Sequence, residues 1–351
     1  MLEIDFDRLR PIGLTPAIAQ ALLQLQFAEG RAVRVTQVQR ETLLVHDGLD
    51  EFGVRAAPAL QRPLASADAL AVGDWGVVCN DTHGAPWLAR CVPAQTQLVR
   101  RAPDGVRQAL VHNVDTAFLL MGLDADFNPR RIERYLALVQ PAGIWPVIVL
   151  TKLDCVESGV VRTEALRARI PADIALVAVD ATSVAAAEVL APYLDAGRTV
   201  VLLGSSGAGK STLTNTLAGT TLQEPGAVRA SDARGRHTTT SRTLRVLTGR
   251  ACLIDTPGLR GLRADIDEND LGMSFSDIDV LGRRCRFRDC SHRAEPGCAV
   301  RTGVDADRLA NFHKLQREIQ RDRMDPLTRQ QLHQQLKVGA RALRARLRDK
   351  H

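Results

Sequence analysis

The chain has 351 residues, 45% of them hydrophobic and 25% charged, which excludes a disordered, collagen-like or low-complexity protein and predicts about two or three globular domains. Its apolar stretches fall well short of the ~18 residues that a membrane helix needs, and its N-terminus is acidic where a signal peptide would be basic, so we expect a soluble, cytoplasmic protein without a membrane partner. The net charge of +6 resides entirely in residues 327–351, with seven Lys or Arg and one acidic residue, a pattern typical of a polyanion-binding tail or of a solvated helix face.

The N-terminal part of the chain predicts one helix followed by short strands. Residues 8–26 form the helix, with Pro11 and Pro16 near its start and apolar residues at helical spacing. From residue 31 to about residue 101, short alternating apolar runs are separated by turn signals such as Asp47-Gly48. Strands at this spacing predict a small all-β barrel or sandwich, and the pattern fits both.

From about residue 113 the pattern becomes that of an α/β domain. Helical segments, such as residues 130–139, separate continuous apolar runs that predict strands at 114–121, 146–150, 174–179 and 199–203. Continuous rather than alternating runs indicate a parallel sheet that is covered on both faces. After Asp265 the chain becomes polar, then Arg-rich, and it favours helix from Ala306 onward.

A phosphate-binding loop directly follows the last of these strands. Residues 204–211 match the pattern G-x-x-x-x-G-K-[ST]. The glycines allow backbone N–H groups to converge on phosphate oxygens, and the helix that follows adds its positive N-terminal end. Lys210 would reach the β- and γ-phosphates, and the Ser211 hydroxyl would bind Mg²⁺. The predicted nucleotide-binding residues in this segment are Gly204, Ser205, Ser206, Gly207, Ala208, Gly209, Lys210, Ser211 and Thr212.

A candidate guanine motif ends an earlier apolar strand, at the edge where α/β sheets bind ligands. It comprises Thr151, Lys152, Leu153 and Asp154, and it resembles the N-K-x-D motif of GTPases. Asp154 can accept hydrogen bonds from both N1–H and the N2 amine of guanine, and because adenine lacks that amine the motif favours GTP over ATP. Thr151 replaces the Asn of the motif, and a hydroxyl offers fewer hydrogen bonds than an amide. After the next strand, Asp180 and Ala181 stand where the looser S-A-x motif would back the base.

Two segments with the pattern of nucleotide-sensing switches follow the phosphate loop. Residues 255–258 resemble the D-x-x-G motif, in which the aspartate, here Asp255, holds Mg²⁺ through water and the glycine, here Gly258, senses the γ-phosphate. The preceding loop, residues 235–240, would supply the Mg²⁺-binding Thr239. In ordinary GTPases the guanine motif comes last, whereas here it precedes the phosphate loop. This order indicates a circular permutation, which preserves a site when the old termini lie close together.

Three cysteines and a histidine in the C-terminal part have metal-ligand spacing. Cys285, Cys290, His292 and Cys298 offer three thiolates and an imidazole, a set typical of tetrahedral Zn²⁺. Four protein ligands leave no open coordination position, so we expect one structural zinc ion per chain, which would fold a loop too short to have its own core. The same loop carries an arginine cluster, as in a nucleic-acid-binding knuckle: Arg283, Arg284, Arg286, Arg288 and Arg293.

Taken together, these motifs resemble the RsgA (YjeQ) family of circularly permuted GTPases. The likeness includes the strings Asp126-Phe127-Asn128-Pro129-Arg130, Gly235-Arg236-His237-Thr238-Thr239 and Cys285-Arg286-Phe287-Arg288-Asp289-Cys290. It implies a multidomain chain with an N-terminal all-β OB-fold barrel that binds rRNA, a central α/β permuted P-loop GTPase domain and a C-terminal α-helical zinc-binding domain. The boundaries we expect are a helical extension at 1–26 and domains at 27–107, 108–264 and 265–351, the last with the basic helical tail.

The resemblance also implies a function. It predicts that the chain binds the small ribosomal subunit and its rRNA and hydrolyses GTP to GDP and phosphate late in subunit assembly, stimulated by the ribosomal particle; we expect a monomer. Leu259 stands where Ras-like enzymes place a water-orienting Gln, and the resemblance assigns that role to His237, for which rRNA contact is the alternative. Two other interpretations stay open. One is an RNA-binding scaffold that binds GTP without hydrolysing it, and the other is a P-loop ATPase, which Asp154 disfavours.

Overall fold

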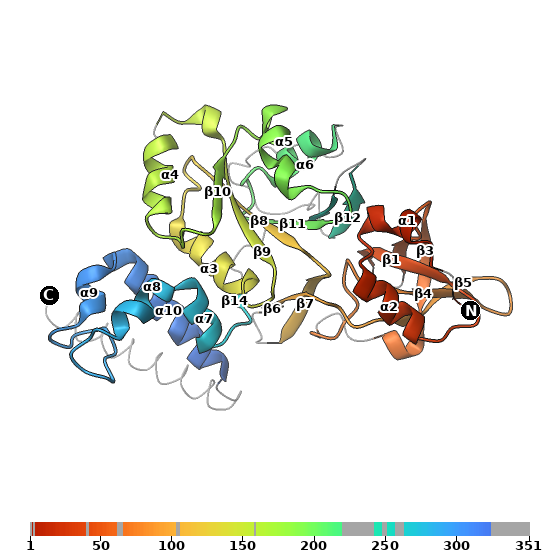
Figure 1. Ribbon diagram of the computed structural model, residues 1–351, viewed down its shortest axis with the longest axis horizontal. Coiled ribbons are helices and arrows are strands. Elements are labelled where there is room, and N and C mark those ends of the chain that lie inside the picture. Colours follow the sequence, from red (N-terminus) through yellow and green to blue (C-terminus); the bar gives the residue numbers. More distant parts are fainter. Residues whose placement is uncertain are drawn as a thin grey trace, which may run out of the picture. The chain divides into compact units, whose positions relative to one another are not determined.

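The computed structural model describes most of the chain in two compact units (Figure 1). The described residues are 2, 4–39, 42–61, 66–102, 106–157, 159–219, 242–247, 251–256 and 263–323. The first unit spans Met1–Asp265 and contains a barrel and an α/β sheet, and the second spans Ile266–His351 and contains helices and the cysteine cluster. Among the described residues, no helix is both long enough and apolar enough to cross a bilayer.

The N-terminal segment forms two helices rather than the single helix predicted over 8–26. They are joined by a 3-10 turn, in the order α1 (Phe6–Leu9), η1 (Arg10–Ile12) and α2 (Pro16–Gln24). The chain leaves helical geometry at Gly13, whose φ of +93° is left-handed and favours glycine. Helix α2 then begins anew, because the Thr15 hydroxyl accepts a hydrogen bond from the Ile18 N–H and Pro16 occupies the first helical position.

The strands that follow close into an OB-fold barrel, which decides between the barrel and the sandwich. They are β1 (Arg31–Val38), β2 (Leu43–His46), β3 (Glu51–Ala56), β4 (Trp75–Asn80) and β5 (Pro86–Cys91), with the 3-10 turn η2 (Pro58–Leu60) after β3. They pair in the order β1-β2-β3-β5-β4, and the antiparallel pairing of β4 with β1 completes the circle. Side chains that include Val33, Val35, Val45 and Leu88 fill the interior.

A second, smaller sheet follows the barrel. Its order is β14-β6-β7, built from β6 (Gln97–Arg101), β7 (Arg107–His112) and β14 (Arg263–Ala264). Asp265, directly after β14, forms ion pairs with Arg101 at 2.9 Å and with Arg107 at 2.6 Å. The end of the first unit is therefore held beside residues that precede the α/β sheet.

The α/β sheet has the predicted parallel core. Its strand order is β10-β9-β8-β11-β13-β12, in which only β12 is antiparallel to its neighbour. The strands are β8 (Thr116–Gly122), β9 (Trp145–Thr151), β10 (Ala175–Ala178), β11 (Thr199–Gly204), β12 (Thr243–Val246) and β13 (Cys252–Asp255). The helical elements between them are α3 (Pro129–Val139), η3 (Leu153–Cys155), α4 (Gly159–Arg167), α5 (Ala185–Leu190), η4 (Ala191–Tyr193) and α6 (Lys210–Ala218).

Helices cover both faces of this sheet, as the continuous apolar runs predicted. Alternate residues of β8 point to opposite faces, so Leu119 packs in the cluster that contains Leu136 of α3, and Phe118 packs in the cluster that contains Leu190 of α5 and Leu213 of α6. Both clusters are buried, which explains why the strand sequences do not alternate with polar residues.

A buried arginine joins the N-terminal segment, the barrel and the α/β sheet. Arg34 of β1 is 0% exposed. Its Nη1 donates to the Ile12 carbonyl at 2.6 Å and to the Thr199 hydroxyl at 2.8 Å, and its Nη2 donates to the Asn113 carbonyl at 2.9 Å. A Cβ at Gly13 would collide with this guanidinium. Because an uncompensated buried charge costs about 3–5 kcal/mol, these contacts hold the elements together as one unit.

The second unit consists of four described helices. They are α7 (Glu268–Ser274), α8 (Ser276–Gly282), α9 (Ala299–Gly303) and α10 (Ala306–Arg323), the last as predicted from Ala306. Arg308 of α10 links the helices, because its guanidinium forms an ion pair with Asp277 at 2.6 Å and stacks over the Phe275 ring at 4.4 Å. The basic tail at 327–351 lies outside the described residues.

Candidate nucleotide-binding site and metal centre

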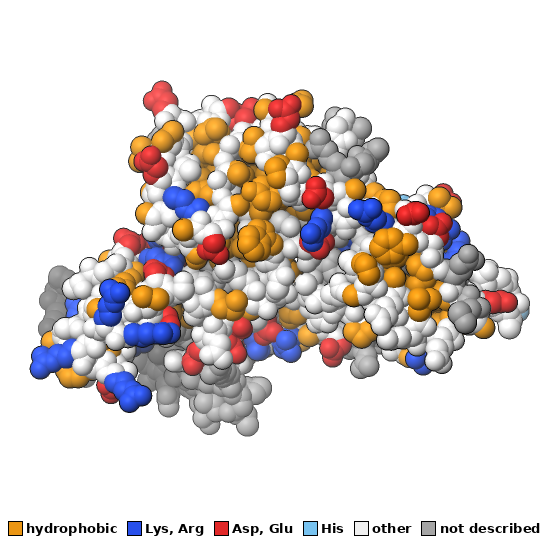
Figure 2. All heavy atoms as spheres, in the orientation of Figure 1, with side chains coloured by type: hydrophobic (Ala, Val, Ile, Leu, Met, Phe, Trp, Pro, Cys, Tyr) orange, Lys and Arg blue, Asp and Glu red, His pale blue; other side chains and the backbone are white. Residues whose placement is uncertain are grey.

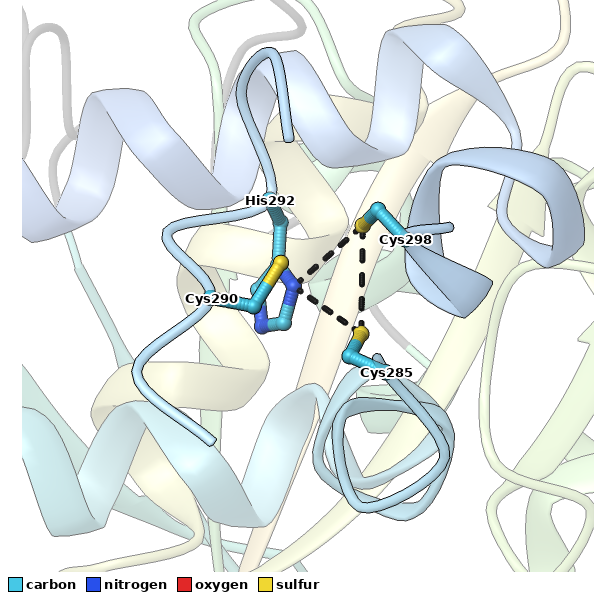
Figure 3. A group of neighbouring side chains, drawn as sticks. All are labelled: Cys285, Cys290, His292 and Cys298. Carbon is cyan, nitrogen blue, oxygen red and sulfur yellow. Dashed lines mark hydrogen bonds between the residues drawn. The ribbon is translucent and has the colours of Figure 1, made fainter. Parts of the chain in front are cut away.

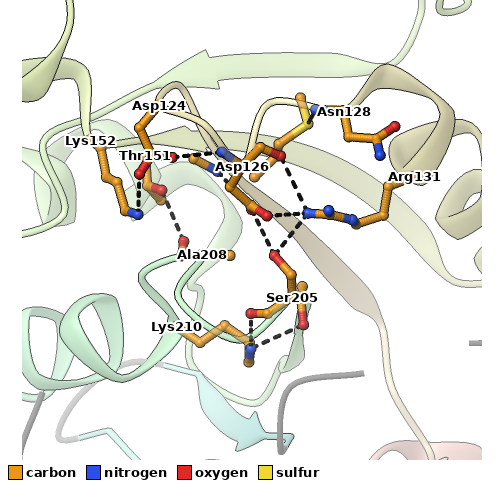
Figure 4. Close-up of polar contacts among 12 residues, drawn as sticks. Asp124, Asp126, Asn128, Arg131, Thr151, Lys152, Ser205, Ala208 and Lys210 are labelled. Carbon is orange, nitrogen blue, oxygen red and sulfur yellow. Dashed lines mark hydrogen bonds and ion pairs between the residues drawn. The ribbon is translucent and has the colours of Figure 1, made fainter. Parts of the chain in front are cut away.

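The predicted phosphate loop lies between a buried strand and a helix. Strand β11 ends at Gly204 and helix α6 begins at Lys210. Gly207 and Gly209 both have φ of +85°, a conformation that side chains other than glycine rarely adopt. The Lys210 ammonium donates to the carbonyls of Gly204 at 3.0 Å and Ser205 at 2.7 Å, so it lies over the loop (Figure 4).

Lys210 is a buried cation. Burial lowers its pKa to about 8, although the nearby carboxylates of Asp255 and Asp126 act in the opposite direction. Its two hydrogen bonds go to neutral carbonyl oxygens rather than to a carboxylate. A phosphate in the loop would therefore offer this ammonium a strong anionic partner.

The candidate guanine motif is tied to the phosphate loop. Thr151 ends β9 and is fully buried, and its hydroxyl donates to the Ala208 carbonyl of the phosphate loop at 2.9 Å. The threonine that replaces asparagine in this motif thus makes a direct contact between the two segments. Lys152 follows with a left-handed φ of +61°, an unusual conformation for a lysine. Asp154 is exposed on η3, in position to meet a ligand from solvent.

Asp180 and Ala181 lie beside the guanine motif and beside α6. The Leu153 N–H donates to the Val179 carbonyl at 3.4 Å, and the Thr216 hydroxyl of α6 donates to the Ala181 carbonyl at 2.7 Å. The hydroxyl and the N–H of Thr182 both donate to the Asp180 carboxylate, and these bonds lower its pKa. The Asp180 carboxylate therefore stabilises the turn that contains Asp180 and Thr182.

Asp255 lies at the end of β13, directly beside the strand that leads into the phosphate loop. It is opposite Leu202 of β11 in the sheet, and the next residue, Thr256, donates its hydroxyl to the Leu202 carbonyl at 2.6 Å. Asp255 is buried, and its carboxylate is close enough to Lys210 to oppose in part the lowering of the Lys210 pKa by burial. The remaining predicted switch residues, His237, Thr239 and Gly258, lie outside the residues that the structure describes.

Three residues near the phosphate loop were not among the predicted site residues. Asp124 and Asp126 follow β8, and Arg131 lies in α3 (Figure 4). Their hydrogen bonds reach both Lys152 and Ser205. A signal was present, because β8 is parallel to β9 and β11, and the carboxyl ends of parallel strands meet at one edge of the sheet.

The second unit brings the four predicted zinc ligands together (Figure 3). The ligand atoms of Cys285, Cys290, His292 and Cys298 all lie within 4.8 Å of one another. The Cys285 and Cys298 sulfurs are 3.9 Å apart, and they lie 3.6 and 3.5 Å from His292 Nδ1. Ligands bound tetrahedrally at ~2.3 Å for sulfur and ~2.0 Å for nitrogen would be about 3.5–3.8 Å apart. The donor set and its spacing thus fit Zn²⁺.

The surroundings favour the metal-binding protonation state at two of the four predicted ligands, His292 and Cys285, whereas burial and the neighbouring Cys298 and Cys285 thiols raise the pKa of Cys290 to about 11. Burial, together with the nearby His313, lowers the pKa of His292, which keeps its imidazole neutral. Burial acts to raise the pKa of Cys285, but hydrogen bonds from the backbone of Val300 and Ala299 outweigh it, and the pKa is lowered. A neutral imidazole and a thiolate are the forms that bind zinc.

Exposed arginines surround the cluster, and Figure 2 shows Lys and Arg side chains spread over this unit. All five arginines of the predicted knuckle are exposed: Arg283, Arg284, Arg286, Arg288 and Arg293. Phe287, in the same loop, is 41% exposed, and the Arg286 guanidinium lies 5.5 Å from its ring centre. The loop therefore presents positive charge and one aromatic face to solvent.

Known proteins are similar to this chain both in sequence and in fold. The family model described as RsgA GTPase matches residues 91–265. A relative from Xanthomonas axonopodis pv. citri (strain 306), named small ribosomal subunit biogenesis GTPase RsgA, is 44% identical over 331 residues, which cover 90% of this chain and 89% of the relative. The chain belongs to the RsgA GTPase family. A protein of the same name from Xylella fastidiosa (strain M23) is 44% identical over 302 residues and covers 84% of this chain and 89% of its own length.

Two solved structures show the RsgA fold at lower identity. The crystal structure of YjeQ from Thermotoga maritima has a TM-score of 0.60 at 22% identity and covers 83% of this chain and 99% of that one. YloQ, described as a circularly permuted GTPase, has a TM-score of 0.55 at 22% identity and covers 86% of this chain and 98% of its own. In this chain too, the candidate guanine motif after β9 precedes the phosphate loop after β11, which is the permuted order.

Proposed function

We propose that this chain is a GTPase that binds the small ribosomal subunit and hydrolyses GTP to GDP and phosphate during late subunit assembly. The observation that carries the proposal is the phosphate loop with its buried Lys210, to which Thr151 ties a guanine motif. Membership of the RsgA family supports it, since relatives 44% identical over most of both chains are named small ribosomal subunit biogenesis GTPases.

The nucleotide would lie along the carboxyl edge of the parallel sheet. Backbone N–H groups of the phosphate loop would bind the phosphates, and Lys210 would bridge the β- and γ-phosphates. Ser211, Thr239 and Asp255 would hold the Mg²⁺ that accompanies GTP and neutralises its phosphate charge, and Gly258 would sense the γ-phosphate. Asp180 and Ala181 would back the base.

Asp154→Asn is expected to relax the preference for guanine. The Asp154 carboxylate would accept two hydrogen bonds from guanine, one with each oxygen. The amide of asparagine has one oxygen that can accept, but its NH₂ group would face the second guanine donor and form no hydrogen bond with it. We therefore expect a loss of discrimination by orders of magnitude, measured as the affinity for GTP relative to ATP and to xanthosine triphosphate.

A neighbouring variant provides the control for this experiment. Glu157→Gln makes the same change of acid to amide at an exposed position in the same segment, and it should leave the preference unchanged. An Asp154→Asn protein that rejected ATP and xanthosine triphosphate as strongly as its parent would disprove the assignment of the base site.

His237 is our candidate for the residue that orients the attacking water. The residue after the D-x-x-G motif is Leu259, which cannot form a hydrogen bond to water. A neutral imidazole can accept one, so His237 would complete the site when the chain is bound to the ribosomal particle. This dependence on the particle would make hydrolysis slow in its absence.

His237→Ala is expected to reduce subunit-stimulated hydrolysis by ~10²-fold or more, the usual range for a lost general base or orienting group. Affinities for GTP and for the small subunit should both stay close to those of the parent. The two affinities and the stimulated rate are measured on the same preparation. A fall in subunit affinity with an unchanged rate at saturating subunit would instead assign His237 to rRNA contact.

We assign rRNA binding to the barrel at residues 27–107 and to the basic parts of the zinc domain at 265–351. The exposed knuckle arginines and the charge of the tail support this assignment, because Lys and Arg supply most of the affinity for a phosphate backbone. The cluster of three cysteines and a histidine would hold one structural Zn²⁺. We further propose that the chain is a monomer and that it acts in the cytoplasm, where ribosomal subunits are assembled.

Phosphate release from GTP, measured with and without purified small subunits, tests the proposal. We expect slow release by the chain alone and a large stimulation by subunits, with ATP a poor substrate. GTP binding without release under either condition would favour the RNA-binding scaffold. Equal hydrolysis of ATP would favour the ATPase. The Lys210→Ala protein, prepared in the same way, reports release by contaminating enzymes.

A further inference from the structure

The loop after β8 touches both halves of the nucleotide site (Figure 4). We propose that Asp124, Asp126 and Arg131 form a brace that holds the phosphate loop and the guanine motif in register with each other. The brace rests on the proposed function, since it positions the groups that bind GTP. None of its three side chains belongs to a nucleotide-binding motif, so these are positioning residues.

The first end of the brace holds the phosphate loop. The Ser205 hydroxyl donates to Asp126 Oδ2 at 2.6 Å and accepts from Arg131 Nη1 at 2.8 Å. Arg131 Nη1 also forms an ion pair with Asp126 Oδ1 at 2.5 Å, which closes a triangle of three side chains. Both hydrogen-bonding directions of the serine hydroxyl are therefore engaged, and its rotamer is defined by groups outside the loop.

The second end of the brace holds the guanine motif. The Lys152 ammonium donates to Asp124 Oδ2 at 2.7 Å. Arg162 of α4 donates to the carbonyls of Leu123 and Asp124, which fixes the backbone from which this carboxylate projects. Lys152 has left-handed backbone geometry, so its conformation depends on contacts of this kind.

The two ends are joined within the loop itself. The N–H of Asp126 donates to Asp124 Oδ1 at 3.1 Å, so one short turn carries both carboxylates. Across the site, Thr151 makes the other link, from the guanine motif to Ala208. The phosphate loop and the guanine motif are thus connected both directly and through the brace.

The brace also bears on the lysine of the phosphate loop. Lys210 donates to the carbonyl of Ser205, the residue whose side chain Asp126 and Arg131 hold. A shift of Ser205 would move this carbonyl and with it the ammonium that meets the phosphates. Misplacement of a catalytic group by about 1 Å can lower activity on the order of 10²-fold, so the contacts that hold Ser205 would also keep Lys210 in its productive position.

Two variants, one at each end of the brace, test the proposal by the affinities for GDP and GMP. Asp126→Asn loosens the phosphate loop, so it should weaken GDP about tenfold, as expected for one lost charge-assisted hydrogen bond, and should lower the ratio of GDP to GMP affinity. Asp124→Asn loosens the guanine motif, which both ligands share, so it should weaken both about equally and leave the ratio unchanged.

A double-mutant cycle isolates the contact at the phosphate end. Ser205→Ala removes the donor of the Ser205–Asp126 hydrogen bond, and Asp126→Asn removes the charge of its acceptor. The effects of these two substitutions on GDP affinity should therefore not add, whereas those of Ser205→Ala and Asp124→Asn should add. Asp173→Asn, an exposed position before β10 at the opposite edge of the sheet, is the matched control and should bind as the parent does. Thermal unfolding of each variant without nucleotide reports any general loss of stability.

The outcomes separate the brace from the function on which it rests. If the parent binds GDP but the two carboxylate variants change the ratio of GDP to GMP affinity alike, or not at all, the brace is overturned and the GTPase proposal stands. Additive effects for Ser205→Ala and Asp126→Asn would overturn it as well. If the parent binds neither ligand, both proposals fall.

Discussion

Lys210→Ala is expected to abolish GTP binding or turnover. Among the residues that the structure describes, the buried ammonium donates only to carbonyls of the phosphate loop, at 2.7 and 3.0 Å, and it would carry the positive charge for the β- and γ-phosphates. Loss of one such preorganised group costs on the order of 10²–10³-fold in kcat, and loss of binding would increase the effect. The measurements are GTP affinity in the presence of Mg²⁺ and single-turnover phosphate release with small subunits.

Lys314→Ala is the control for this variant. It makes the same substitution at an exposed position on α10, in the other unit of the chain, and should bind and hydrolyse GTP as the parent does. Parent-like GTP affinity and turnover in the Lys210→Ala protein would remove the phosphate loop from the mechanism, and with it the central argument for a GTPase.

Replacement of Cys290, one of the four predicted zinc ligands, is expected to release the metal and to unfold its loop. The parent should contain about one Zn²⁺ per chain, and Cys290→Ala should contain much less. Because metal binding supplies about 10–16 kcal/mol in structural zinc sites, residues 280–300 should lose protection from hydrogen exchange. Metal analysis and exchange measured by mass spectrometry test both expectations on the same samples.

Cys155→Ala, at an exposed cysteine outside the cluster, should keep the full metal content. The first unit, with its own buried core, should keep its exchange protection in the Cys290→Ala protein. Disulfide bonds among Cys285, Cys290 and Cys298 in protein isolated under reducing, zinc-replete conditions would contradict the metal site.

Local patterns were sufficient to predict most of the candidate site residues. The phosphate loop is a continuous run of residues in which the order of the glycines and the lysine carries the signal, and the predicted zinc ligands lie within a short segment. Continuous apolar runs predicted the parallel sheet because strands that are covered on both faces carry apolar side chains on both sides and do not alternate with polar residues. Family resemblance then extended these patterns to the OB-fold barrel, which the closing β1–β4 pairing confirms.

The single helix predicted over 8–26 was wrong because the apolar spacing was given more weight than the local punctuation of the segment. The apolar spacing was sound, since Leu9, Ile12, Ile18 and Leu22 are all buried. The chain leaves helical geometry at Gly13, and a new helix begins with the Thr15 cap and Pro16. What the segment could not reveal is the packing around Gly13, where the Arg34 guanidinium of the barrel occupies the space that a side chain would need.

The sequence by itself was sufficient to identify the family and to predict the two candidate sites, because residue types and spacings within short segments carry that information. Only the tertiary structure decided how separate segments cooperate: the barrel closes through β1 and β4, Arg34 joins three elements, and Asp124 and Asp126 reach across to the guanine motif and the phosphate loop. The physical reason is that these contacts join residues that are distant along the chain. A hydrogen bond between two such side chains produces no repeating pattern of polar and apolar residues in either segment.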